Sequence, residues 1–402
     1  MTQENSQLSI GVPKETFPDE QRVAIIPELV PLLKKKNLSI AVESGAGIRS
    51  GFSDTDYSEK GARIVNERAE LFKSCDIIFQ VRSLGANPEK GLSDLALFRS
   101  GQIVIGHFEP LSEPALITKT AATGVTSFAM ELLPRITRAQ GMDALSAMAT
   151  VAGYKAVLIA AAASHKMFPL LMTAAGTISP AHVFIIGAGV AGLQAIATAN
   201  RLGAVVNAYD VRPAVKEQVE SLGAKFIELE ITATEQEDKG GYAKAMDKEF
   251  YQRQQSLMSD VIAKSDIVIT TAAVPGKKAP ILITADMVKG MSSGSIIVDL
   301  AAERGGNCEL TEPGKTVSVN GVKIIGPVNL SSTIPYHASQ MYSRNLQSFV
   351  LNLVKDGNAN LNLEDEIIND TMLTHKGEVV NQKVRELLGL GKTPQEQVRG
   401  EN

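Results

Sequence analysis

A glycine-rich turn after a predicted strand is the segment of this sequence best suited to bind a ligand. The apolar run His182–Ile186 leads directly into Gly-x-Gly-x-x-Gly over residues 187–192, and an Ala-rich helical stretch follows. In such a turn the first glycine allows the tight bend, the second lets backbone N–H groups approach a pyrophosphate, and the third lets helix and strand pack closely. The helix N-terminus faces the same negative charge. We therefore predict a dinucleotide site at Gly187, Gly189, Val190, Ala191 and Gly192.

The next predicted strand ends in a carboxylate that bears on which dinucleotide binds. Asp210 follows Val205–Tyr209, at about the distance where an acid accepts hydrogen bonds from the adenosine ribose. A carboxylate there repels a 2′-phosphate, so NAD(H) is favoured over NADP(H). Val211 and Arg212 extend this part of the site. The guanidinium of Arg212 could bind a 2′-phosphate, stack on adenine or meet solvent, and these alternatives stay open.

Two further loops follow later predicted strands. They are Thr270–Gly276 and Asp299–Asn307, both rich in small residues. Ligands in open α/β sheets bind outside the carboxyl ends of the strands, so we expect Ala272 and Ala273 to contact the cofactor. Ordinary tight turns are the alternative explanation.

A long insertion separates the third and fourth strands of this second series. It runs from Glu230 to Lys264 and contains two adjacent glycines followed by an aromatic residue, Gly240, Gly241 and Tyr242. Long loops in compact domains are usually lids or disordered segments. We predict a flap that brings Gly241 and Tyr242 to the bound nucleotide, with a disordered surface insertion as the alternative.

A polar stretch, Pro134–Ser146, stands where the first predicted domain meets a long helix. Arg135, Gln140 and Asp143 offer a forked donor, an amide and a carboxylate. Such a trio could hold the ribose and carboxamide of a nicotinamide while a hydride moves. From the residues alone, helix capping and surface ion pairs explain the cluster equally.

Groups for acid–base or metal chemistry are not evident. A hydroxy- or amino-acid dehydrogenase needs a His or Lys to manage the substrate proton, and His107, after a predicted strand, is the one candidate that could face a cleft. No histidine forms a recognisable dyad with Asp or Glu. Cys75 and Cys308 follow no metal-ligand spacing, so we predict no metal site and two buried thiols in a reducing compartment.

The composition is that of a soluble globular protein. The 402 residues suit two or three domains, and 40 Lys and Arg against 44 Asp and Glu give a net charge of −4. That charge makes nucleic acid an unlikely partner. Residues 1–8 do not resemble a signal peptide, and the most apolar run, Ala156–Ala163, is far shorter than the ~20 residues that span a bilayer. We expect a cytoplasmic chain without a membrane span.

The elements that position these residues form two series of alternating strands and helices. This alternation predicts an α/β fold with two Rossmann-like doubly wound parallel-sheet domains, joined by long helices at 142–168 and 339–354. The expected ligand site is the cleft between them. The domains are 1–141 with 346–369, and 142–345, followed by a C-terminal arm at 370–402. Strands are predicted at 9–12, 39–42, 77–81, 103–105, 125–128, 183–186, 205–209, 226–229, 267–271, 296–300 and 322–325.

The sequence resembles the NAD(H)-binding alpha subunit, domain I, of proton-translocating nicotinamide nucleotide transhydrogenases. The resemblance covers roughly residues 10–354. Gly11–Glu15, Arg22–Ala24 and Glu43–Gly47 look like the opening shared by this family and the related alanine dehydrogenases. The stretch Pro134–Asp143 matches the transhydrogenase loop that embraces the nicotinamide, and Gly240–Tyr242 looks like its mobile loop.

The resemblance assigns roles to particular residues. Arg135, Gln140, Asp143 and Ser146 become the catalytic set of the nicotinamide end. The Lys of alanine dehydrogenases is replaced here by Arg82, and His107 lies about two places from their His, which makes amino-acid turnover doubtful. NAD-dependent alanine dehydrogenase is the alternative function, and a nucleotide-sensing module without catalysis is a third.

The resemblance also implies a reaction and partners. Hydride passes directly between NADH here and NADP+ on a partner subunit, coupled to proton translocation. Because two nicotinamides exchange hydride without a proton change at the reacting carbons, positioning is the main task of the protein. The membrane-spanning and NADP(H)-binding subunits are then other polypeptides, and this chain is a homodimer held peripherally on the inner membrane through them.

Overall fold

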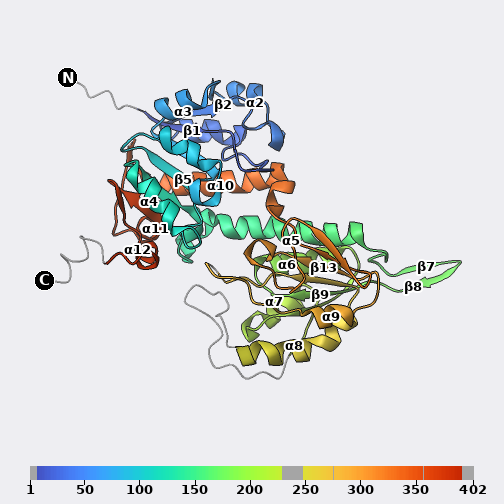
Figure 1. Ribbon diagram of the computed structural model, residues 1–402. Helices are drawn as coiled ribbons and strands as arrows, with labels where there is room; N and C mark the ends of the chain where they lie inside the picture. The colour runs from blue at the N-terminus through green and yellow to red at the C-terminus, as the bar shows by residue number, and fades with distance from the viewer. Residues whose placement is uncertain (1–6, 229–247, 275, 356, 392–402) are drawn as a thin grey trace, which may run out of the picture. The chain divides into compact units, whose positions relative to one another are not determined.

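The computed structural model describes residues 7–228, 248–274, 276–355 and 357–391, and it contains two compact units (Figure 1). The first unit is Met1–Met148 with Ser332–Asn402, and the second is Ala149–Ser331. The corresponding boundaries predicted from the sequence lie after residues 141 and 345. The predicted fold class is confirmed, because each unit holds a mostly parallel sheet with helices packed against it.

The first unit is built on an eight-stranded sheet. Six of its strands are parallel, and the five strands predicted from the sequence are all among them. Their runs are almost continuously apolar because both faces are covered, as in the buried Ile77–Val81. In spatial order the parallel strands are β3 (Arg63–Val65), β2 (Leu38–Glu43), β1 (Leu8–Val12), β4 (Ile77–Arg82), β5 (Ile103–His107) and β6 (Thr126–Ala129).

Part of the predicted C-terminal arm instead completes this sheet. β18 (Met372–His375) runs antiparallel to β6, and β19 (Glu378–Val379) pairs with β18. The hydroxyls of Ser127 and Thr374 lie 2.7 Å apart across the β6–β18 pair. The turn between β18 and β19 has positive φ at Lys376 and Gly377, as in the tightest hairpins. A Lys-Gly turn and strands this short are weak sequence signals, which is why the hairpin was not predicted.

The second unit is built on a seven-stranded sheet whose order reverses at its first strand. β9 (His182–Ile186) lies between β10 and β12, so chain segments diverge from it in both directions. Such a reversal is where open α/β sheets bind ligands. β11 is shorter than the predicted 226–229, and Leu229 lies outside the described residues. The remaining strands are β10 (Val205–Tyr209), β11 (Lys225–Phe226), β12 (Ile267–Thr270), β13 (Ile296–Asp299), β14 (Thr316–Val319) and β15 (Val322–Ile325).

Alternation along β9 explains why helices cover both faces of this sheet. Val183 and Ile185 pack in a cluster with α5 (Ala144–Ala163), α6 (Val190–Arg201) and α7 (Lys216–Ser221). Phe184 and Ile186 pack on the opposite face, with side chains from α8 (Lys248–Ala263) and α9 (Ala285–Lys289). The doubly wound arrangement is therefore a direct result of the two-residue period of the strand (Figure 1).

The two predicted long helices are present with shifted ends. α5 begins after a short 3-10 helix at Thr137–Met142, and its first turn is capped by Asp143, which accepts hydrogen bonds from the backbone N and Oγ of Ser146 at 2.9 and 2.5 Å. α10 (Pro335–Leu353) begins earlier than predicted because proline is tolerated in the first turn. Of the described helices, α5 alone is long and apolar enough to cross a membrane, by length and composition only.

The other described elements are short. They are helices α1 (Val30–Lys34), α2 (Asp54–Glu59), α3 (Arg68–Ser74), α4 (Pro114–Ala122), α11 (Glu366–Thr371) and α12 (Gln382–Leu387), and the hairpins β7 (Leu171–Thr173) with β8 (Gly176–Ile178) and β16 (Val354–Lys355) with β17 (Asn358–Ala359).

Candidate nucleotide site

The turn between β9 and α6 has the geometry that its three glycines predict. Gly187 has φ of +98°, and a Cβ there would lie 2.5 Å from Oγ1 of Thr271. A Cβ on Gly192 would lie 1.8 Å from the carbonyl oxygen of Gly187, so α6 can approach the turn only without a side chain. By contrast, a Cβ on Gly189 would meet no heavy atom of the described chain within 4 Å. Two glycines are thus needed for packing, and the third faces open space.

The N-terminus of α6 faces this open space without a cap. Gly189 is the N-cap residue, and no side chain of the described chain accepts a hydrogen bond from the first turn. The N–H groups at a helix start need acceptors, and a pyrophosphate supplies them. Gly153 of α5, which was not predicted from the sequence, lets that helix pack on the same turn, because a Cβ there would lie 2.1 Å from the carbonyl oxygen of Ala191.

Asp210 lies beside the turn and is already paired. Its buried carboxylate accepts from the backbone N of Ala188 at 2.7 Å and from the backbone N, Nε and Nη2 of Arg212, each at 2.9 Å. The ion pair with Asp210 is a fate of Arg212 that was not foreseen. Because the guanidinium offsets the carboxylate charge, repulsion of a 2′-phosphate is weaker than that from a bare Asp210, and the position of the carboxylate becomes the stronger argument for NAD(H).

The loop after β12 is joined to the glycine turn. Oγ1 of Thr271 donates to the carbonyl oxygen of Gly187 at 3.1 Å, so Ala272 and Ala273 follow immediately beside the turn. Ala273 is exposed, and Ala272 is half-buried. The structure therefore brings together the predicted residues of the second unit, with two exceptions. Gly241 and Tyr242 lie outside the described residues.

The predicted nicotinamide residues belong to the first unit. Arg135 and Gln140 are exposed, whereas Asp143 and Ser146 form the capping pair at the start of α5. Arg138 pairs with both carboxylate oxygens of Asp365, at 2.9 and 2.5 Å. The amide of Asn345 on α10 donates to the carbonyl oxygen of Gly141 at 3.0 Å. The loop that carries Arg135 and Gln140 is therefore braced on both sides of Gln140.

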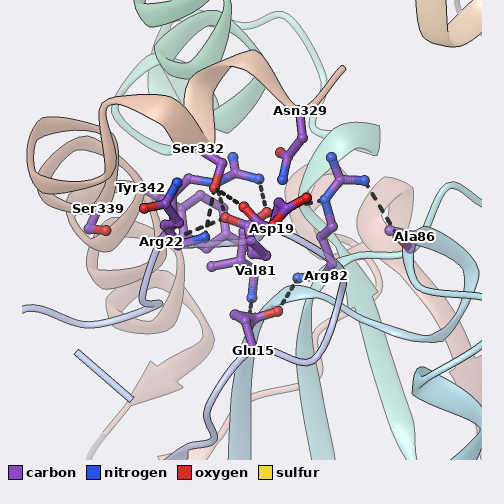
Figure 2. A network of polar contacts seen from close by, with 12 residues as sticks. Glu15, Asp19, Arg22, Val81, Arg82, Ala86, Asn329, Ser332, Ser339 and Tyr342 are labelled. Carbon is purple, nitrogen blue, oxygen red and sulfur yellow. Dashed lines mark hydrogen bonds and ion pairs between the residues drawn. The ribbon is translucent and has the colours of Figure 1, made fainter. Parts of the chain in front are cut away.

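A second polar cluster occupies the carboxyl edge of the first sheet (Figure 2). The buried carboxylate of Glu20 accepts from Nε and Nη2 of Arg22, at 2.7 and 2.6 Å, and from Nε of Arg82 at 3.2 Å. Burial alone would raise the pKa of Glu20, but the two guanidinium groups lower it to about 2. Both arginines therefore already hold an internal carboxylate.

Glu15 lies beside this cluster and behaves differently. Its two oxygens accept from the backbone N–H groups of Val81 and Arg82, at 2.6 and 3.1 Å. Although solvent reaches part of the residue, burial of its carboxyl group and the charge of Glu20 raise the pKa of Glu15 to about 8. The protein can thus hold a proton there near neutral pH.

His107 has a carboxylate partner that was not predicted from the sequence. Its Nδ1 lies 3.4 Å from a carboxylate oxygen of Glu131, and its ring stacks on Tyr342 with centroids 5.4 Å apart. Glu131 follows β6, the strand next to β5, and only the sheet brings the two together. The expectation that no histidine pairs with an acid was wrong at this position. Within the described ranges, no group of His, Cys, Asp and Glu is arranged to hold a metal ion.

Comparisons with known proteins match both units. The family models described as alanine dehydrogenase/PNT, N-terminal domain and C-terminal domain match residues 11–152 and 156–382. The first of the polypeptides that make up the NAD(P) transhydrogenase alpha subunit of Rhodospirillum rubrum is 44% identical over 377 residues, which are 93% of this chain and 98% of that protein. An alanine dehydrogenase of Staphylococcus saprophyticus is 29% identical, over 96% of this chain and 98% of that protein.

A solved structure shows the same fold. The transhydrogenase from Sinorhizobium meliloti superposes with a TM-score of 0.83 and 46% identity, covering 92% of this chain and 100% of that one. The match to the transhydrogenases is therefore markedly stronger than the match to the alanine dehydrogenase.

Substitutions of two glycines in the turn should have opposite effects. Gly189→Ala places its methyl group in open space, so the free energy of unfolding should change by less than about 0.5 kcal/mol while NADH affinity falls roughly tenfold. Gly192→Ala collides with Gly187 and should destabilise the protein by about 1–3 kcal/mol. Thermal unfolding and NADH calorimetry measure both. Unchanged NADH binding by Gly189→Ala would remove the turn from the site.

The proton on Glu15 should appear in the pH dependence of stability. An unfolded Glu ionises near 4.5 but Glu15 does so near 8, so the unfolded state binds fewer protons across this interval. Stability should therefore fall as pH rises from about 4.5 to about 8, by up to about 1.4 kcal/mol per pH unit.

Glu15→Gln should remove that slope. The amide adds a constant cost because one of its two terminal atoms is a donor facing a backbone N–H, so the slopes, not the absolute stabilities, are compared by denaturant unfolding. Glu70→Gln, at an exposed carboxylate, is the control and should retain the slope of the unmodified protein. Parallel curves for Glu15→Gln and the unmodified protein would contradict the assignment.

Proposed function

The chain belongs to the alanine dehydrogenase/PNT family, and from this premise we propose that it is the NAD(H)-binding subunit of an NAD(P) transhydrogenase. In the proposed reaction, hydride passes directly from NADH on this chain to NADP+ on a partner subunit. The observation that carries the proposal is the turn of Gly187–Gly192, with open space at Gly189 and an uncapped helix behind it.

The second unit holds the nucleotide in this proposal. The N–H groups at the start of α6 bind the pyrophosphate, and Asp210 meets the adenosine ribose by sharing its carboxylate with Arg212 or releasing it. Val211 lies beside them, while Ala272 and Ala273 border the nicotinamide half across the turn. Bound NAD(H) supplies the hydride chemistry, and the chain supplies orientation. Gly241 and Tyr242 are proposed to close over the nucleotide.

The first unit positions the nicotinamide ring. Arg135 and Gln140 are exposed and so accessible to a ligand, and Asp143 with Ser146 completes the set. The braces at Arg138 and Asn345 support this role, because a reacting ring must be placed within a fraction of an ångström. No proton moves at the reacting carbons, so these residues orient and exclude water and need no general acid or base.

The partners follow from the same family. The relatives are named as alpha subunits or as the first portion of one, which supports an assembly with separate polypeptides. One of these binds NADP(H), and membrane-spanning subunits couple hydride transfer to proton translocation. We place this chain in the cytoplasm, peripheral on the inner membrane through its partners. α5 has only 39% of its apolar window buried within the chain, which fits a helix that is covered in an assembly.

A homodimer is supported by the exposed hairpin of β7 and β8, which extends away from the second unit (Figure 1). Met172 is 79% exposed, and Leu170 and Ile178 are also exposed. Contiguous exposed apolar side chains are rare on monomers and mark interaction surfaces. A second copy of this chain is the occupant we propose.

Alanine dehydrogenase activity is the second candidate, and one observation favours it. The pair of His107 and Glu131 at the carboxyl edge of the first sheet is arranged for proton transfer. Against it, Arg22 and Arg82 are both held by Glu20. NADH formation from L-alanine and NAD+ by the purified chain would favour this candidate over the transhydrogenase.

Gln140→Asn should separate binding from hydride transfer. The shorter side chain keeps the amide but withdraws it by one methylene, so NADH affinity should stay within about twofold. Hydride transfer to NADP+ on the added partner subunit should slow at least tenfold, since misplacement by ~1 Å can cost about 100-fold. Stopped-flow single turnovers measure the rate. An unchanged rate would exclude Gln140 from the site.

Met172→Asp should dissociate the homodimer. A charge at this apolar tip has to be buried against the second copy, which is unfavourable without a partner charge. Sedimentation should show monomers, whereas Leu387→Asp, at an equally apolar exposed site on α12, should leave the dimer intact. A dimer that survives in Met172→Asp would show that the hairpin is not the interface.

A further inference from the structure

We propose that Asn307 is a positioning residue for the nicotinamide half of bound NAD(H), acting through the loop that follows β12. The inference rests on the proposed function and deepens it. Asn307 follows two glycines after β13 and is completely buried. It does not reach the open space at the glycine turn itself, and its effect is carried by the backbone of Ala272.

The side-chain amide of Asn307 pairs with both polar groups of one backbone residue. Its Oδ1 accepts from the N–H of Ala272 at 3.0 Å, and its Nδ2 donates to the carbonyl oxygen of Ala272 at 2.9 Å. The same Nδ2 donates to the carbonyl oxygen of Pro280, also at 2.9 Å. One side chain therefore holds the beginning and the end of the loop 272–280.

Asn307 is itself held by a buried carboxylate. Oδ2 of Asp299, at the end of β13, accepts from the backbone N of Asn307 at 2.7 Å, and from Cys308 and Thr311. Its Oδ1 accepts from Oγ1 of Thr270 at 2.9 Å, which ties the ends of β12 and β13 together. The amide of Asn307 is thus fixed before any ligand arrives.

The preceding residue fixes the other side of the loop. Thr271 is hydrogen-bonded to Gly187 in the glycine turn, and Ala272 is clamped by Asn307. The next residue, Ala273, is exposed and begins the unclamped part of the loop. The direction in which the peptide after Ala272 faces is therefore set by Asn307 rather than by the loop itself.

The position of this loop in the sheet indicates which half of the nucleotide it serves. Asp210, at the end of β10, lies on one side of β9, and the loop after β12 lies on the other. A dinucleotide whose adenosine ribose meets Asp210 and whose pyrophosphate meets the turn must extend its second nucleoside toward β12. That nucleoside carries the ring that reacts.

Asparagine is the residue that this clamp requires. The site needs one acceptor and two donors on a short, planar group, and aspartate supplies the acceptor without the donors. Asn307→Asp therefore keeps the volume but leaves two buried carbonyl groups without their donor. Asn307→Ala removes the clamp altogether.

The test compares two ligands that differ only beyond the second ribose. NADH and ADP-ribose are titrated by calorimetry into the full chain, unmodified and as Asn307→Asp and Asn307→Ala. We expect NADH affinity to fall roughly tenfold, the effect of about 1.4 kcal/mol of lost interaction, with ADP-ribose affinity within about twofold. Asn200→Ala, which removes an amide hydrogen bond to Leu222 in the same unit, is the control and should alter neither.

Single-turnover hydride transfer with the partner subunit adds a second readout. We expect a slower rate at saturating NADH for both Asn307 variants. Equal losses of NADH and ADP-ribose affinity would indicate a structural role only and overturn the proposal, as would unchanged NADH affinity and unchanged rate. If the unmodified chain transfers no hydride to NADP+, the proposed function fails, while the comparison of the two ligands still decides the role of Asn307.

Discussion

The close approach between α6 and the turn after β9 is the constraint on which the nucleotide site depends. The carbonyl oxygen of Gly187 occupies the space that any side chain at residue 192 would need. With glycine there, the helix begins directly beyond the strand and its N-terminus lies at the carboxyl edge of the sheet. Asp210 then reaches Ala188 in the turn, and Thr271 reaches Gly187 from the neighbouring strand. A wider turn would lose all of these contacts together.

The two units share a strand order but use their carboxyl edges differently. In the second unit this edge has open space at Gly189. In the first unit it is occupied by the carboxylate of Glu20, held by Arg22 and Arg82, and by Glu15, whose raised pKa keeps it protonated near neutral pH. A buried ion pair contributes little net stability, because desolvation offsets the attraction, but it defines which groups face one another. One edge is built to receive an anion, and the other already contains its own.

Much of this structure could be predicted from the sequence because local signals and packing agree. The apolar strands, the long helices, the glycine turn and Asp210 follow from periodicity and from the roles of particular residue types. Contacts made by the fold could not be predicted, since they join positions far apart in the chain. His107 meets Glu131 only across neighbouring strands, and Asn307 meets Ala272 only after β12 and β13 have paired.

Other differences have local causes. Arg212 pairs with Asp210 two residues away, a choice among several partners that sequence spacing cannot rank. β18 and β19 are too short to show a period, so the C-terminal arm was expected where an antiparallel sheet edge exists. Whether Arg135 and Gln140 orient a ring, as the family resemblance implies, depends on chemistry that only the bound nucleotide reveals.

The central claim is that this chain delivers hydride by orientation alone, without exchange with water. The most direct measurement uses NADH with deuterium at the transferred position, NADP+ and the reconstituted subunits, and follows the label by mass spectrometry. The account predicts that the deuterium of each oxidised NADH is recovered in NADPH. Deuterium released to solvent, or NADH oxidised without labelled NADPH, would contradict it.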